Sequence, residues 1–216
     1  MAMISPSILA ADFANLERDI RDIEAMGSDF VHVDVMDGIF VPNISIGIPV
    51  VKSIRPVTKL PLDVHLMIDR PIRYVEDFVK AGADFVTIHV EADQPQNTLE
   101  ALDKIHALGC KAGIVLKPRP PAEAAIPYLE KCDMILVMTV EPGSGGQKFM
   151  ADMMPKVSKL RQMLDHVNPG CLLEVDGGVD AVTCHICKES GANVLVAGSA
   201  YFKAPDRAAF VKQLQK

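Results

Sequence analysis

Short runs of apolar residues alternate with segments of helical periodicity along the whole chain. Eight runs are apolar at nearly every position, which is typical of strands buried on both faces of a parallel sheet. The predicted strands are Ile4–Leu9, Phe30–Asp34, Leu62–Met67, Phe85–His89, Lys111–Leu116, Met134–Met138, Leu172–Asp176 and Val194–Ala197. Apolar residues that recur every three or four positions predict helices at Leu16–Met26, Ile72–Ala81, Asn97–Leu108, Asp152–Leu164, Ala181–Ser190 and Pro205–Gln215.

A glycine recurs at the junction between a helical segment and the apolar run that follows it. Gly27, Gly82, Gly109 and Gly191 occupy such junctions, and successive ones are 55, 27 and 82 residues apart. These separations are near multiples of 27, and the 216 residues of the chain hold eight such lengths. Glycine suits the position just after a helix because it adopts positive φ easily. The pattern therefore predicts eight repeated units of a helix and a strand.

Eight parallel strands that alternate with helices are most economically closed into a barrel. Crossovers between parallel strands are right-handed, and closure removes both exposed sheet edges. We therefore expect a single α/β domain, a (β/α)8 barrel that spans residues 1–216. An open doubly wound sheet is the alternative, and the eightfold spacing disfavours it.

Charge and composition exclude several classes of partner. The chain has 22 basic and 28 acidic residues, a net charge of −6, and no basic cluster that would attract nucleic acid or an anionic membrane. No apolar stretch approaches the roughly 18 residues of a membrane span. We therefore expect a small-molecule partner, with no nucleic acid and no membrane, and recognition of a single phosphate at most.

Five cysteines lie in the second half of the chain, an odd number without disulfide spacing. Together with the lack of a signal-peptide pattern in the first residues, they predict a cytoplasmic protein with reduced thiols. The segment Cys184-His185-Ile186-Cys187 invites a metal or redox role, but no second cysteine pair completes a zinc site. We interpret it as an ordinary part of a helix.

Ionisable side chains interrupt three predicted strands, where a buried charge without a partner costs several kcal/mol. They are His32 and Asp34 in the second strand, Asp63 and His65 in the third, and Glu174 and Asp176 in the seventh. All lie at or near the carboxyl ends of their strands, where barrel active sites are assembled. Two imidazoles and two carboxylates meeting there would bind a divalent transition metal such as zinc, iron(II), manganese or cobalt. The alternative is that His32–Asp34 and His65–Asp63 are hydrogen-bonded core pairs that bind nothing.

Glycine-rich segments follow the last three predicted strands. They are Gly143-Ser144-Gly145-Gly146-Gln147, Gly177-Gly178 and Gly198-Ser199. Consecutive free backbone N–H groups form anion-binding nests, and barrels often bind phosphate near strands seven and eight. Met36, Met67 and Met138 fall at or just past strand ends, either as core filler or as an apolar lining that excludes water from a bound intermediate.

A phosphate site beside a metal between two carboxylates suits a small phosphorylated sugar with a carbonyl group. Metal coordination of the carbonyl and adjacent hydroxyl oxygens would stabilise the cis-enediolate that forms when the α-proton leaves. A carboxylate on each face of the enediolate would remove the proton from one side and return a proton on the other. The constellation therefore predicts an epimerase.

Several motifs are longer than this chemistry alone requires. They are Ile4-Ser5-Pro6-Ser7-Ile8-Leu9, His32-Val33-Asp34-Val35-Met36-Asp37-Gly38-Ile39-Phe40-Val41-Pro42-Asn43, Asp63-Val64-His65-Leu66-Met67, Val137-Met138-Thr139-Val140-Glu141-Pro142-Gly143 and Glu174-Val175-Asp176-Gly177-Gly178. Nearly end to end, the chain resembles the ribulose-phosphate 3-epimerase family. The resemblance implies a TIM barrel that interconverts D-ribulose 5-phosphate and D-xylulose 5-phosphate in the pentose phosphate pathway. It also implies one divalent metal per subunit and a homo-oligomer, commonly a dimer or hexamer.

The resemblance assigns roles to particular residues of this chain. The implied metal ligands are His32, Asp34, His65 and Asp176, with Asp34 and Asp176 as the catalytic acid–base pair. The implied substrate contacts are Ser7, His65, Gly143, Ser144, Gly145, Gly146, Gly177, Gly178, Gly198 and Ser199, and the implied cap over the enediolate is Met36, Met67 and Met138. His89, at the end of the fourth predicted strand, is either a partner of a ligand or a satisfied core residue.

One position departs from the family pattern and keeps an alternative substrate open. The family usually has Pro-Gly-Phe-Gly-Gly-Gln where this chain has Ser144 in place of the aromatic residue. Without it, the loop would be more mobile or admit a longer sugar, so the nearest alternative is an epimerase of a six-carbon ketose phosphate such as D-allulose 6-phosphate.

A lyase of the same barrel group is disfavoured because its Asp-x-Lys-x-x-Asp pattern is absent. A non-catalytic phosphosugar binder has no need of two metal-linked carboxylates.

Overall fold

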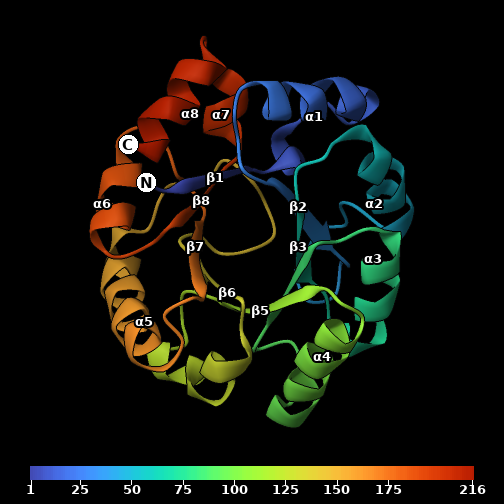
Figure 1. Cartoon of the computed structure of the whole chain (residues 1–216), viewed down its shortest axis with the longest axis vertical. Helices are drawn as coiled ribbons and strands as arrows, with labels where there is room; N and C mark the ends of the chain where they lie inside the picture. Colours follow the sequence, from blue (N-terminus) through green and yellow to red (C-terminus); the bar gives the residue numbers. More distant parts are fainter.

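Eight parallel strands form one barrel in a computed structural model that describes residues 1–216 (Figure 1). The strands are β1 (Met3–Pro6), β2 (Val31–Met36), β3 (Leu62–Met67), β4 (Phe85–His89), β5 (Lys111–Leu116), β6 (Met134–Met138), β7 (Leu172–Asp176) and β8 (Val194–Ala197). From β2 to β8 each strand pairs with its sequence neighbour, and β1 pairs with β8. Ser7 then pairs with His32 of β2, which closes the barrel. The predicted (β/α)8 fold is confirmed.

Helices surround the barrel on the outside (Figure 1). They are α1 (Leu16–Ala25), α2 (Ile48–Ile54), α3 (Val75–Ala81), α4 (Pro95–Ala107), α5 (Met154–Val167), α6 (Thr183–Glu189), α7 (Ser199–Lys203) and α8 (Arg207–Gln215). The connection between β5 and β6 is a 3₁₀ helix, Ala122–Lys131, with Pro127 inside it. Proline lacks the N–H that an α-helix needs at that position, which explains the tighter helix type. None of the helices combines the length and the apolar character needed to cross a membrane.

The bounds of the predicted strands are correct for β3 to β8 and wrong for the first two. The first strand stops at Pro6 instead of Leu9, because the Ser7 hydroxyl accepts a hydrogen bond from Leu9 N and begins a 3₁₀ turn. The second strand runs from Val31 to Met36 and so extends beyond Asp34, because its pairing with β3 continues to the Met36–Met67 pair. These changes leave Asp34 and Met36 inside the strand.

An aspartate or asparagine precedes each even-numbered strand and ties it to the strand before. Each side chain accepts a hydrogen bond from a backbone N–H: Asp29 from Ile4 (2.8 Å), Asp84 from Leu62 (2.8 Å), Asp133 from Ala112 (2.9 Å) and Asn193 from Leu173 (2.8 Å). The backbone N–H of each donates in turn to the carbonyl of the same partner. The barrel is thus built from four similar two-strand units, which explains why Asp or Asn recurs beside the junction glycines.

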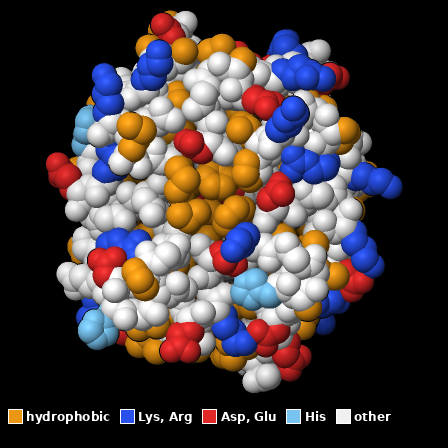
Figure 2. All heavy atoms as spheres, in the orientation of Figure 1, with side chains coloured by type: hydrophobic (Ala, Val, Ile, Leu, Met, Phe, Trp, Pro, Cys, Tyr) orange, Lys and Arg blue, Asp and Glu red, His pale blue; other side chains and the backbone are white.

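The core lies in two places, around the barrel and inside it. A cluster of 51 buried residues fills the layer between strands and helices. At the end where the strands begin, the interior is closed by Phe30, Met134 and Val194, with Met3, Phe85 and Leu172 packed on them. Figure 2 shows hydrophobic side chains at the centre of this face. The interior therefore opens to solvent only toward the carboxyl ends of the strands.

All five cysteines are buried and unpaired. Cys184 and Cys187 lie in helix α6, where both side chains pack into the core. Burial raises the pKa of the Cys187 thiol to about 12, so the thiol stays protonated at neutral pH. The interpretation of this segment as an ordinary helix fits its position.

Candidate active site

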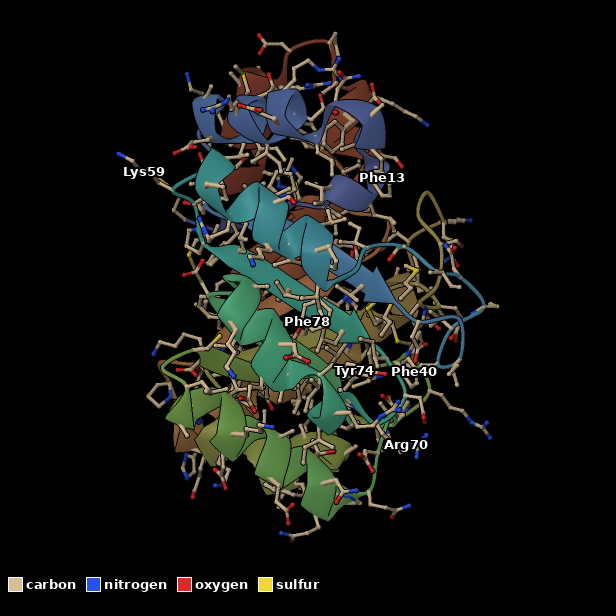
Figure 3. The ribbon with its side chains drawn as sticks, turned by 90° about the vertical axis from the view of Figure 1, so that its right-hand side faces the viewer. Phe13, Phe40, Lys59, Arg70, Tyr74 and Phe78 are labelled. Carbon is tan, nitrogen blue, oxygen red and sulfur yellow. The ribbon has the colours of Figure 1, made fainter.

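A cavity of about 330 Å³ opens at the carboxyl end of the barrel. Figure 3 shows the barrel from the side, with Phe40 and Arg70 at the end toward which the arrow of β2 points. The cavity brings together residues of the first three and last three strands and the segments that follow them. They are Ser7, Asp34, Met36, Met67, Met138, Gly143, Ser144, Gly145, Gly146, Asp176, Gly177, Gly178, Gly198 and Ser199. His32 and His65 lie fully buried behind the two aspartates.

The two imidazoles and two aspartates converge on one point at the base of the cavity. Asp34 Oδ1 lies 3.2 Å from His32 Nε2 and 3.0 Å from His65 Nδ1. Asp176 Oδ2 lies 3.9 Å from each of the same two nitrogens. The four potential ligand atoms all fall within 4.8 Å of one another. Residues separated by up to 144 positions in the sequence thus form one cluster, because their strands end at the same face.

The cluster fits a divalent transition metal in chemistry and in size. A cation with bonds of about 2.0–2.2 Å holds its ligand atoms about 3 to 3.5 Å apart, close to the separations seen here. Two imidazole nitrogens and two carboxylate oxygens are also a donor set that zinc, iron(II), manganese and cobalt accept. These residues are therefore able to hold one such ion.

His32 is oriented by a carboxylate on the adjacent strand. Asp63 Oδ2 lies 2.6 Å from His32 Nδ1 and also accepts a hydrogen bond of 3.1 Å from the Ser5 hydroxyl. The Nδ1 proton of His32 therefore points to Asp63, and Nε2 faces the cluster. This pairing of His32 with Asp63 differs from the sequence alternative, in which His32 pairs with Asp34 and His65 with Asp63.

Glu174 lies beneath the cluster and is fully buried. Neither of its side-chain oxygens has a donor in the protein, and His32 Nδ1 lies 3.8 Å from Oε1. Burial and the charge of Asp63 raise the pKa of Glu174 well above its usual value. Glu174 therefore keeps its proton to a higher pH than an exposed glutamate does.

The two aspartates of the cluster have opposite pKa shifts. Burial alone would raise the pKa of Asp34, but His32 and His65 beside it hold the pKa well below its usual value. Burial and the charge of Asp34 raise the pKa of Asp176 to about 7. Burial would lower the pKa of His32, but Asp63 and Asp34 raise it well above its usual value. In the absence of a cation, a proton on His32 thus compensates the buried negative charge.

His65 is held by residues of strand β4 and the segment that follows it. Its Nε2 lies 2.9 Å from His89 Nε2, and His89 Nδ1 lies 3.3 Å from Glu91 Oε2. Burial lowers the pKa of His89 to about 4, so this imidazole is neutral. The sequence left the role of His89 open and gave no reason to select Glu91, although Glu91 is two positions on and therefore on the same face.

Two hydroxyl groups fix the positions of the aspartates. The Ser7 hydroxyl donates to Asp34 Oδ2 at 2.5 Å. Thr139 donates from its backbone N–H to the Asp176 carbonyl (2.8 Å) and from its hydroxyl to the Gly177 carbonyl (2.6 Å). Thr139 was not predicted, because a threonine after a strand gives no distinctive sequence signal.

The glycines after β7 allow the backbone to approach the cavity closely. Gly177 and Gly178 have φ values of +122° and +66°. A Cβ atom on Gly177 would lie 2.6 Å from Val140 Cγ2, and one on Gly178 would lie 2.6 Å from Phe149 N. The backbone N–H groups of these two residues and of Gly198 donate to no protein acceptor. They are therefore available to an anion in the cavity.

The Gly143–Gln147 loop covers the other side of the cavity and is braced at both ends. The Asn43 side-chain amide donates to the Gly143 carbonyl at 3.0 Å, and the Gln147 side chain donates to the carbonyls of Glu141 (2.6 Å) and Ser144 (2.8 Å). Ser144 itself is exposed.

The three cavity methionines, Met36, Met67 and Met138, are at most 4% exposed and present apolar surface beside the aspartates.

Comparison with known proteins identifies relatives of the whole chain. Residues 3–202 match the model of the ribulose-phosphate 3 epimerase family. The ribulose-phosphate 3-epimerase of Synechocystis sp. is 49% identical over 206 residues, which cover 95% of this chain and 90% of that protein. The enzyme of the same name from Bacillus subtilis is 46% identical over 216 residues, 100% of this chain and 99% of that protein.

Solved structures with much lower identity share the fold. The crystal structure of KGPDC from Streptococcus mutans superposes with a TM-score of 0.73 at 16% identity, covering 100% of this chain and 96% of that chain. A 3-hexulose-6-phosphate synthase from Salmonella typhimurium gives a TM-score of 0.71 at 18% identity, covering 100% and 97% of the two chains. At such identities the likeness concerns the barrel alone.

Proposed function

Because this chain belongs to the ribulose-phosphate 3-epimerase family, we propose that it inverts C3 of D-ribulose 5-phosphate to form D-xylulose 5-phosphate. The enzyme is an epimerase, of the isomerase class. The observation that carries the proposal is the pair of aspartates on β2 and β7, which meet at one ion-sized point at the base of the cavity. No side chain with another proton-transfer chemistry lines this cavity.

His32, Asp34, His65 and Asp176 would hold one divalent metal in this site. Bound there, the metal would act as a Lewis acid toward the carbonyl and hydroxyl oxygens of the ketose phosphate and so favour loss of the C3 proton. The identity of the metal among zinc, iron(II), manganese and cobalt is a matter for metal analysis.

Asp34 and Asp176 act as the acid–base pair of the proposed reaction. An ionised carboxylate takes the C3 proton from one face of the sugar, and a protonated carboxyl returns a proton to the other face. The opposite pKa shifts of Asp34 and Asp176 support this division, because neighbouring carboxyls driven apart in pKa provide one base and one acid near neutrality. In the reverse reaction the two residues exchange roles.

The remaining cavity residues bind the substrate and shield the intermediate. The free N–H groups of Gly177, Gly178 and Gly198 supply donors for the phosphate, and the Gly143–Gly146 loop and Ser199 border the same end of the cavity. Ser7 lines the base of the cavity and His65 is buried behind Asp34, so both would lie close to the reacting carbon. The three methionines cover the planar enediolate with apolar surface, which excludes water and protects the intermediate.

The proposed assembly is a homo-oligomer, a dimer or a hexamer. The exposed side chains of Ile39 and Ile44 after β2 are apolar surface that an interface would cover. Light scattering of the purified protein measures the assembly directly, and a monomeric mass would contradict this part of the proposal.

Turnover of two substrates tests the proposed function. With D-ribulose 5-phosphate and D-allulose 6-phosphate compared under the same conditions, we expect a higher kcat/KM for the five-carbon substrate. A preference for D-allulose 6-phosphate would assign the enzyme to the six-carbon alternative that Ser144 leaves open. Binding without turnover of either sugar would contradict the epimerase assignment altogether.

A further inference from the structure

A chain of three side chains leads from the proposed metal site to the surface of the barrel. His65 on β3 pairs in register with Thr87 on β4, so His89, two residues further, lies beyond it on the same face. The two imidazoles are fully buried, with Nε2 atoms 2.9 Å apart and ring planes inclined by 34°. His89 Nδ1 then faces Glu91 Oε2 at 3.3 Å, and the Glu91 side chain is 22% exposed.

The positions of the protons along this chain are linked. Of the two facing Nε2 atoms, one must carry a hydrogen and the other must accept it, because a neutral imidazole has one N–H and one lone pair. If His65 Nε2 carries the hydrogen, His65 Nδ1 is a lone pair that points at the cluster. His89 then carries its own hydrogen on Nδ1 and donates it to Glu91. In this direction every group has a partner once a cation lies between His65 Nδ1 and Asp34 Oδ1.

When a cation is bound, the opposite direction is unfavourable at both ends of the chain. A hydrogen on His89 Nε2 would leave a lone pair on His89 Nδ1 facing the Glu91 carboxylate, so that two acceptors would meet. It would also place the hydrogen of His65 on Nδ1, where it would block coordination of a cation. Glu91 accepts only, so its carboxylate selects the direction that keeps His65 Nδ1 free.

Other contacts hold Glu91 and His89 in this arrangement. Glu91 Oε1 accepts a hydrogen bond of 2.8 Å from the backbone N–H of Lys117. The Phe40 ring packs on His89 with centroids 4.8 Å apart, and Lys117 Nζ lies 3.7 Å from the centroid of the Phe40 ring. A side chain that only filled the core at position 89 would need neither the carboxylate nor this enclosure.

We propose that His89 and Glu91 are positioning residues that fix His65 in the tautomer with hydrogen on Nε2 and so present its Nδ1 to the metal. The inference rests on the proposed metal site and extends it beyond the four ligands. It parallels the pairing of His32 with Asp63 on the other side of the cluster, where a carboxylate directly sets the tautomer of the second imidazole.

The test reads the tautomer of His65 and the affinity for metal, not activity. Zinc binding to the metal-depleted protein is measured by competition with a chelator, and ¹⁵N NMR of labelled histidine reports which nitrogen of each ring carries hydrogen. In the zinc-bound wild-type protein we expect His65 to carry hydrogen on Nε2. Without zinc, His65 Nδ1 faces the Asp34 carboxylate at 3.0 Å and competes for that hydrogen. The chain has six histidines, and single substitutions assign their signals.

Three substitutions and a control probe the chain of hydrogen bonds. His89→Leu removes the acceptor of the Nε2 hydrogen, and we expect the zinc Kd to rise about 10- to 100-fold and the metal-free His65 to carry its hydrogen on Nδ1, toward Asp34. His89→Gln keeps an acceptor for His65, and its Kd should return to within about 5-fold of the wild-type value. Glu91→Gln has one acceptor oxygen for two donors, His89 and Lys117. Its loss of zinc affinity should be intermediate between those of the two His89 variants. His106→Leu, at the opposite end of the barrel, should leave zinc binding unchanged.

Each outcome decides a separate point. If His89→Leu and Glu91→Gln both bind zinc as the wild-type protein does, with the tautomers of the metal-free His65 unchanged, the positioning role is wrong while the metal site stands. If the wild-type protein binds no divalent metal, the proposed site itself is wrong. Should His89→Leu fail to fold, Glu91→Gln, at a partly exposed position, decides the point alone.

Discussion

Two aspartates of identical chemistry are given different properties by their surroundings. Asp34 is bracketed by two imidazoles and the Ser7 hydroxyl, which stabilise its charge. Asp176 has no such donors on its carboxylate and sits beside the charge of Asp34, and together with burial this charge raises its pKa to about 7. The proposed division into base and acid would therefore arise from position within one cluster, not from residue type.

Removal of either carboxylate should abolish epimerisation. Asp34→Asn and Asp176→Asn each keep the size of the side chain but lose the proton-transfer group and one charge of the metal site. We expect kcat to fall by a factor of about 10³ or more, since general acid–base catalysis alone contributes about 10²–10⁴. A coupled assay of D-xylulose 5-phosphate formation measures this. Turnover near the wild-type rate by either variant would refute the role assigned to that residue.

The raised pKa of Asp176 also predicts how stability depends on pH when metal is absent. The folded protein keeps the Asp176 proton up to about pH 7, whereas the unfolded chain loses it near pH 4. The free energy of unfolding therefore falls as pH rises from 4 to 7, by at most about 4 kcal/mol from this group. Asp176→Asn removes that penalty, so urea unfolding with a chelator present should show a smaller loss between pH 5 and pH 8.

An equal loss of stability in wild-type and Asp176→Asn protein over that range would contradict the raised pKa. Glu174→Gln provides a comparison, because burial and Asp63 raise the pKa of Glu174 as well. Its stability at pH 8 should also exceed that of the wild-type protein, although it lines no part of the substrate cavity.

The residues of the cluster could be selected from the sequence because they contrast with their surroundings. A histidine or aspartate within an otherwise apolar strand is conspicuous, and alternation assigns it to a face. His89 stood out for the same reason. Glu91 and Thr139 did not, because Glu91 lies beyond the end of β4 and Thr139 contacts β7, and no single-strand pattern records such contacts.

At the scale of elements, the four aspartate or asparagine links divide the barrel into two-strand units. We expect Asp29→Ala to lower the free energy of unfolding by about 1–2 kcal/mol, since Ile4 N would lose its acceptor. Asp29→Asn should lower the free energy of unfolding much less. Asn193 occupies the corresponding position at β8, where its side-chain oxygen accepts the same kind of hydrogen bond. Chemical denaturation measures both, and equal stability of the two variants would show that the link contributes little.

The close approach of Gly178 to Phe149 makes substrate binding sensitive to a single methyl group. In Gly178→Ala, a Cβ atom 2.6 Å from Phe149 N would displace the backbone beside the proposed phosphate site. We expect KM to rise about 10-fold or more with a smaller change in kcat, because bound phosphate positions the sugar. Gly27→Ala is the matched control, since it also requires positive φ but lies at the opposite end with no atom within 4 Å. Its KM should stay unchanged.

Six of the eight strands were predicted with correct bounds, because strands buried on both faces have abrupt apolar limits. The predicted helices omit α2, α7 and the 3₁₀ helix Ala122–Lys131, together with three-residue 3₁₀ turns such as Phe13–Asn15. Helix α7 has five residues and the 3₁₀ helix contains Pro127, so neither has the length or the periodicity that identifies a helix. Helix α2 has seven residues and begins with a proline in its first turn.

At the scale of the whole molecule, closure of the barrel brings the site together. The pairing of β1 with β8 and of Ser7 with His32 places β2, β3 and β7 around one axis. The 27-residue spacing predicted this closure, since eight equal units leave no strand unpaired. The oligomeric state and the cytoplasmic location depend on surfaces and signals outside the site, and both stay predictions.

Exchange of the C3 proton with solvent tests the central claim most directly. The metal-depleted enzyme is incubated with D-ribulose 5-phosphate in D₂O, and a divalent cation is added in steps up to one per chain. We predict that deuterium appears at C3 of the D-xylulose 5-phosphate formed only as the cation binds, with the rate levelling off at one equivalent. Full exchange and turnover by the metal-depleted protein would contradict a site in which four residues hold one cation between two proton-transferring aspartates.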